Sequence, residues 1–123
     1  MKQSSMAIVC NLFMVCCSLS CSRLNHSINL TVSESERYYK IEAHYNIDNT
    51  GAVEKCMDDH LRKHGDPSFM NTSIDGNLTL NNGTTFYIKN YPGQLEIKFD
   101  KTENSTAALN DIKSLAKDLK PSI

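Results

Sequence analysis

Apolar and polar residues alternate along the chain from residue 28 onward. The apolar side chains that share one face of the first run are Ile28, Leu30 and Val32. Residues 39–45 repeat the same alternation. A period of two gives a strand one buried and one solvent-facing side, which is typical of an antiparallel sheet. Because the intervening residues 33–36 are polar, the two runs are expected to form a hairpin.

A helical period replaces the alternation over residues 46–67. The side chains that recur at spacings of three and four along one side are Val53, Cys56, Met57, His60, Leu61 and His64. Such a stripe predicts an amphipathic helix with one buried face. Asn49 or Thr50 can cap its N-terminus, and Gly65 and Pro67 are expected to end it.

Short runs separated by turn dipeptides follow this helix. The runs cover residues 68–74, 77–81, 84–90 and 94–100, and the dipeptides between them are Asp75-Gly76, Asn82-Gly83 and Pro92-Gly93. Asp-Gly and Asn-Gly supply the positive backbone angles that two-residue hairpins need. This part of the chain therefore predicts an antiparallel meander.

A second amphipathic helix is predicted over residues 105–120. Its apolar stripe consists of Ala108, Leu109, Ile112, Leu115, Ala116 and Leu119. Asn104 or Ser105 is expected to cap its start, and Pro121 to stop it.

These elements predict a single α+β domain over residues 28–123. Helices with one apolar stripe and strands with one apolar face are most simply combined as two layers. The expected architecture is a two-layer sandwich, with an antiparallel sheet of about five to six strands and two helices on one of its faces. The expected order is strand, strand, helix, four strands, helix.

The N-terminus has the organisation of a signal peptide. Lys2 provides a short positive region, and a nearly uncharged apolar run of about fifteen residues follows it. Such a run is shorter than the roughly 20 apolar residues of a membrane span. We expect residues 1–20 to be a signal peptide and residues 21–27 a short tether.

The end of that signal resembles the lipobox of bacterial lipoproteins. Ser20 is a small residue directly before Cys21, although Ser18 stands where that family usually has a branched apolar residue. The resemblance covers only about the first 22 residues. It implies cleavage before Cys21, which would carry diacylglycerol on its sulfur and hold the protein at the membrane surface. The expected location is the periplasm or the outer membrane; otherwise the protein is secreted.

Asparagine sequons offer an alternative interpretation of the same signal. The N-x-[ST] matches begin at Asn25, Asn29, Asn71, Asn77, Asn82 and Asn104. In a eukaryote they would indicate a secreted N-glycoprotein. If Cys21 were then not acylated, it could form a disulfide with Cys56, and the sequence leaves these two states open.

Charge and motif content argue against several function classes. The chain has 13 basic and 14 acidic residues, and no basic stripe that would neutralise phosphates. Nucleic acid is therefore not an expected partner. The chain also contains no G-x-S-x-G motif, which would indicate a nucleophilic serine, and no glycine-rich loop that would bind phosphate. We expect a protein that is not an enzyme and has no cofactor.

Cys56, His60 and His64 are candidate metal ligands, because they recur at a spacing of four on the first predicted helix. Thiolate and imidazole bind zinc or copper well. Ligands eight residues apart on a helix are separated by about 12 Å, so one ion would need ligands from elsewhere. A metal-handling periplasmic protein is accordingly one alternative function.

Four residues form a candidate binding surface. The alternation places Tyr38, His44 and Tyr87 on the sheet face opposite the core, and Tyr91 lies in the adjoining turn. Tyrosine is among the residue types most enriched at protein interfaces. The leading hypothesis is a non-catalytic binding protein with a protein partner in the envelope or outside the cell. A periplasmic inhibitor or immunity-like module is one form it could take.

Overall fold

The computed structural model describes residues 28–123. Cys21, the expected signal peptide and the expected tether lie outside these residues. Within residues 28–123 no helix is both long enough and apolar enough to cross a membrane.

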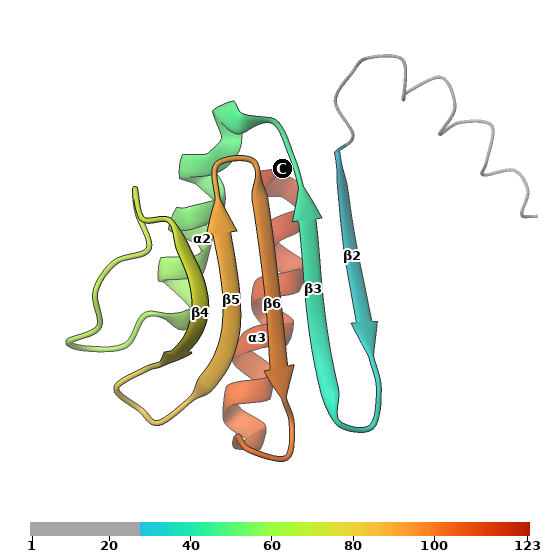
Figure 1. Cartoon of the computed structure of the whole chain (residues 1–123), viewed down its shortest axis with the longest axis vertical. Coiled ribbons are helices and arrows are strands. Elements are labelled where there is room, and N and C mark those ends of the chain that lie inside the picture. The colour runs from blue at the N-terminus through green and yellow to red at the C-terminus, as the bar shows by residue number, and fades with distance from the viewer. Residues whose placement is uncertain (1–27) are drawn as a thin grey trace, which may run out of the picture.

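One antiparallel sheet of five strands forms the first layer (Figure 1). The strands are β2 (Asn29–Glu34), β3 (Tyr38–His44), β4 (Ile74–Thr79), β5 (Thr85–Tyr91) and β6 (Gln94–Asp100). Their order across the sheet is β2-β3-β6-β5-β4, and every neighbouring pair is antiparallel. The last strand in the chain, β6, is therefore central, and it lies between the β2–β3 hairpin and the β4–β5 hairpin.

Two helices form the second layer, α2 (Thr50–Leu61) and α3 (Thr106–Leu119). Short 3-10 turns precede the first (Ile47–Asn49) and follow the second (Lys120–Ser122). The helices pack against each other, and both lie behind the sheet in Figure 1. The predicted α+β class, with an antiparallel sheet and two helices on one face, is confirmed.

The core lies between the layers and is built from the apolar faces that alternation and helical period predict. Ile41, Ile97 and Ile88 are in register across three neighbouring strands, and all three are fully buried. Met57 from α2 and Leu115 from α3 are also fully buried. Burying such side chains stabilises the fold by roughly 1.5–3 kcal/mol each.

Helix α3 begins and ends as the sequence predicts. The Ser105 hydroxyl accepts a hydrogen bond of 3.0 Å from the backbone N–H of Ala108, which satisfies a donor that the first helical turn leaves unpaired. The helix ends at Leu119, just before Pro121. Five members of its predicted stripe are buried, and Leu109 is partly buried.

The predicted turn at Asp75-Gly76 is wrong. Both residues lie inside β4, which begins at Ile74 and pairs with β5 over its whole length. The ladder to β5 supplies backbone hydrogen bonds that outweigh the local turn preference of Asp-Gly. The expected strand over residues 68–74 is a loop up to Ser73. The turns at Asn82-Gly83 and Pro92-Gly93 are confirmed, with both glycines at positive φ.

Carboxylates of α2 hold the loop that replaces the expected strand. Asp58 accepts a hydrogen bond from the Ser68 hydroxyl and another of 2.7 Å from the backbone N–H of Phe69. Glu54, one turn earlier, accepts one of 2.8 Å from the backbone N–H of Asn71. The loop is thus fixed against α2 by charge-assisted hydrogen bonds, which are stronger than neutral ones.

Candidate functional site

The sheet surface that faces away from α2 and α3 is the candidate site, and it faces the viewer in Figure 1. We call this surface the open sheet face. Its residues on the three central strands are Tyr38, Lys40, Glu42, His44, Thr85, Tyr87, Lys89, Tyr91, Gln94, Glu96, Lys98 and Asp100. Along each strand these residues alternate with the buried ones. The same period of two therefore places one set of side chains in the core and the other set on this face.

Tyr38 and Tyr87 line one hollow of about 660 Å³ on the open sheet face. Lys98 lies between them: its Nζ is 4.4 Å from the centroid of the Tyr38 ring, and its backbone is in register with Tyr87. A lysine at this distance over an aromatic face is attracted by the ring electrons. The other residues that line the hollow are Asn77, Thr85, Phe86, Glu96, Asp100 and Glu103. We call this feature the tyrosine hollow.

Asp100 carries a fixed negative charge at one edge of the tyrosine hollow. Its carboxylate accepts hydrogen bonds of 2.7 and 2.9 Å from the hydroxyl and the backbone N–H of Thr102, and it forms an ion pair of 2.9 Å with Arg37. The Thr102 hydroxyl, followed by Arg37, lowers the pKa of Asp100 to about 2. Arg37 also lies 5.2 Å from the Tyr38 ring centroid, so that ring has two cations close to it.

Tyr87 is held by a carboxylate of the neighbouring strand β4. Its hydroxyl donates a hydrogen bond of 2.7 Å to Asp75 Oδ1. This bond raises the pKa of Tyr87 to about 12, so the phenol stays protonated at any physiological pH. The Tyr87 ring is therefore oriented before any partner arrives, which reduces the entropy that binding must offset.

His44 and Tyr91 lie on the same face but at its other end. Both are in register with Gln94, from opposite sides. Gln94 and Lys98 are four residues apart on β6, which separates the two groups by about 13 Å along the strand. Tyr91 is the last residue of β5 rather than part of the turn, and 37% of it is exposed. The structure thus brings the four predicted binding residues to one face as two pairs.

The three candidate metal ligands have different surroundings. Cys56 is buried, and its burial, followed by the negative charge of Asp118, raises the pKa of its thiol. His60 Nε2 lies 2.9 Å from Asp118 Oδ2 on α3. His64 is exposed and lies beyond the end of α2 at Leu61, so it does not continue the helical spacing. Among residues 28–123 no three His, Cys, Asp or Glu side chains are arranged to hold a metal ion.

The charged residues that surround the two tyrosines of the hollow are not predicted by the sequence. Lys98 and Asp100 alternate with the buried residues of β6, so their face could be predicted, but their neighbours could not. Their contact with Tyr38 depends on β6 pairing with β3, a strand that lies far away in the chain, before α2. No local signal in the sequence specifies that pairing.

Comparisons with known proteins find no matching family model, no matching curated protein and no matching solved structure. The geometry of the open sheet face is therefore the basis on which a function can be proposed.

Proposed function

We propose that the protein is a non-catalytic binding module of the cell envelope or the extracellular space, and that its open sheet face binds a protein partner. The observation that carries this proposal is the tyrosine hollow, in which Lys98 lies between Tyr38 and Tyr87. Rigid tyrosines supply large contact areas at a low conformational-entropy cost, and they are enriched where proteins bind proteins.

The charges of the open sheet face favour a protein over a polyanion. Its three central strands carry three lysines and three carboxylates on this face, namely Lys40, Lys89, Lys98, Glu42, Glu96 and Asp100. Mixed charges around aromatic side chains are typical of the polar rim of protein interfaces. A nucleic acid would need an excess of positive charge, and this face has none.

Attachment through Cys21 remains our proposal for the location. A diacylglycerol on its sulfur would anchor the protein to a membrane surface, with residues 21–27 as the tether. A single small domain with a preorganised surface would suit an inhibitor or immunity-like module, an inference that rests on general architecture.

Affinity capture with matched variants tests the function. The bait is the mature protein, compared with a Tyr38→Ser/Tyr87→Ser variant and with a Lys55→Ser/Asp59→Ser variant. Lys55 and Asp59 form an exposed ion pair on the outer side of α2, so that variant alters two side chains in the helix layer. Circular dichroism confirms that each bait is folded.

The expected result is a specific envelope protein that the wild type and the helix-layer variant retain equally. The tyrosine variant should retain at least about tenfold less of it, since aromatic anchors commonly contribute about 2 kcal/mol or more. Equal recovery on all three baits, or no specific protein on the wild type, would contradict the proposed function.

A glycan on Asn77 would be incompatible with this function as we propose it. Asn77 lines the tyrosine hollow, and its backbone is in register with Tyr87. A bulky sugar there would occupy the surface that the partner needs. Peptide mapping by mass spectrometry of the protein from its native source therefore separates the two interpretations: diacylglycerol on Cys21 supports the envelope module, and a glycan on Asn77 supports the secreted glycoprotein.

A further inference from the structure

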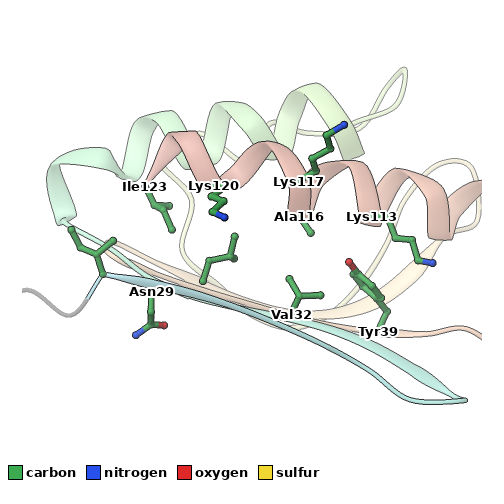
Figure 2. Close-up of a pocket in the computed structure, with 10 residues that line it drawn as sticks. Asn29, Val32, Tyr39, Lys113, Ala116, Lys117, Lys120 and Ile123 are labelled. Carbon is green, nitrogen blue, oxygen red and sulfur yellow. The ribbon is translucent and has the colours of Figure 1, made fainter. Parts of the chain in front are cut away.

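A groove runs between the edge strand β2 and helix α3, on the side of the sheet opposite the tyrosine hollow (Figure 2). Figure 2 shows Val32 and Tyr39 on the sheet side of the groove, and Ala116 and Ile123 on the helix side. The groove is open to solvent and has a volume of about 720 Å³, within the roughly 300–1,000 Å³ of small-molecule pockets. We call it the β2–α3 groove.

The floor of the groove is the apolar face of β2, most of which is not covered by the helices. Val32 is in register with Ile41 on the neighbouring strand, yet 43% of Val32 is exposed whereas Ile41 is fully buried. Ile28, directly before the strand, is 50% exposed. Apolar side chains of adjacent strands thus share one face, but on the edge strand only Leu30 is partly buried against the core. An exposed apolar strip of this kind commonly marks a binding surface.

The rim of the groove is positively charged. Lys113, Lys117 and Lys120 line it from α3 and the following turn, and no Asp or Glu is among the lining residues. Lys113 lies 3.8 Å from Glu34. Lys117 and Lys120 form no ion pair with any residue between 28 and 123. Figure 2 shows the Lys117 side chain extending away from the sheet, so in this structure Lys120, and not Lys117, presents an unpaired ammonium to the apolar floor, and the flexible Lys117 stem would have to turn toward a ligand.

We propose that the β2–α3 groove binds a monomeric anionic amphiphile of the fatty-acid class. Its acyl chain lies on the floor formed by Ile28, Leu30 and Val32, and its carboxylate pairs with Lys117 and Lys120. Transfer of the chain from water drives the binding. The two lysines fix the direction in which the ligand lies, because a charged head is stabilised only at the rim.

The shape of the site favours one bound molecule over a lipid bilayer. A bilayer contacts a convex or flat apolar surface, whereas the lysines here border a concave floor of limited volume. This site is independent of the tyrosine hollow, because the two lie on opposite faces of the sheet. The inference can therefore hold or fail whatever the partner of the open sheet face.

Isothermal titration of the mature protein with decanoate, undecanoate and dodecanoate, each below its micelle concentration, tests the proposal. Affinity should rise by about two- to fourfold for each added methylene, as expected for a chain that is partly buried. Dodecanol, which has the same chain and no charge, should bind more weakly than dodecanoate. Added salt should reduce the affinity for dodecanoate and leave that for dodecanol unchanged.

Variants locate the ligand. Lys117→Glu/Lys120→Glu should weaken dodecanoate binding by about tenfold or more and remove the preference over dodecanol. Val32→Asp should weaken both ligands, since it places a charge on the floor. All three side chains are exposed, so the variants are expected to fold. Lys55→Glu on the outer side of α2 is the matched control and should leave both affinities unchanged.

Four outcomes would overturn the proposal. The first is no binding of any member of the series. The second is binding that Lys117→Glu/Lys120→Glu leaves unchanged. The third is binding to phosphatidylglycerol vesicles, but not to monomeric dodecanoate, which would make the groove a membrane-contact surface instead. Sizing chromatography accompanies the titration, and a dimer that Val32→Asp dissociates would show that a second copy occupies the groove.

Discussion

The hydroxyl of Tyr87 on β5 donates a hydrogen bond of 2.7 Å to Asp75 on β4, and this bond raises the pKa of Tyr87 to about 12. Ionisation would break the bond and place two negative charges side by side. The raised pKa therefore reports directly whether the tyrosine hollow is formed in solution.

The Asp75→Asn variant should lower the pKa of Tyr87 from about 12 toward its ordinary value of 10. A spectroscopic titration of tyrosinate formation measures this pKa. The Tyr87→Phe variant shows which step of the titration belongs to Tyr87, because that step is absent from it. The sign for stability follows from the same shift. Stabilisation by this bond is complete below pH 10 and is lost as the pH rises through about 12. An unchanged titration in Asp75→Asn would contradict the geometry.

Two glycine substitutions should change stability in opposite directions. Gly93 has φ of +82°, and a Cβ there would lie 3.1 Å from the carbonyl oxygen of Tyr45. Gly93→Ala should cost roughly 1–3 kcal/mol in the free energy of unfolding. Gly51 in α2 has open space around it, and Gly51→Ala should add up to about 1 kcal/mol. Urea unfolding measures both, and a neutral Gly93→Ala would refute the predicted conformation of the β5–β6 turn.

Removing the buried carboxylate of Glu54 should destabilise the fold strongly. Glu54 accepts hydrogen bonds from the buried Asn90 side chain at 3.0 Å and from the backbone N–H of Asn71 at 2.8 Å. Glu54→Ala removes the acceptor of both bonds, although Asn90 Nδ2 keeps its bond of 2.8 Å to the carbonyl of Thr72, and the loss costs roughly 1–3 kcal/mol. Glu36→Ala in the exposed β2–β3 turn is the control and should stay within about 0.5 kcal/mol of the wild type. Similar unfolding midpoints for the two variants would contradict this prediction.

The sequon at Asn104 should stay unmodified even in a eukaryotic secretory host. Asn104 Nδ2, the atom that would carry the glycan, donates hydrogen bonds to the carbonyls of Thr85 and Asp100 at 2.9 and 2.8 Å. Asn82 lies exposed in the β4–β5 turn and is the accessible comparison. Glycopeptide mass analysis after secretion should find Asn82 modified in preference to Asn104. Occupancy of Asn104 equal to that of Asn82 would contradict this prediction.

The sequence predicts the local parts of this fold well, because they depend on neighbouring residues. Alternation identifies the faces of β3, β5 and β6, and the cap at Ser105 identifies the start of α3. The predicted turn at Asp75-Gly76 is wrong because pairing between β4 and β5 outweighs the preference of this dipeptide for a turn. For the tyrosine hollow, the sequence predicts only that the tyrosines share one face of the sheet. The positions of Lys98 and of the carboxylates beside them depend on the insertion of β6 between β3 and β5.

The β2–α3 groove could not be predicted either, because it too depends on how elements that are distant in the chain pack together. Alternation places Leu30 and Val32 on the apolar face of β2, which normally indicates burial. Whether an apolar face is covered depends on where the helices lie across the sheet. Here α3 lies along the groove and leaves Val32 43% exposed.

Photocrosslinking in cells of the native source tests the central claim most directly. A benzophenone amino acid replaces Lys40 or Lys89 on the open sheet face, which leaves both tyrosines of the hollow intact. In control chains it replaces Lys55 or Ala107 on the exposed side of the helix layer. We predict that both open-face positions give one adduct with the same protein and that the helix positions do not. Adducts from the helix positions alone, or from none of the four, would contradict a binding function of the open sheet face.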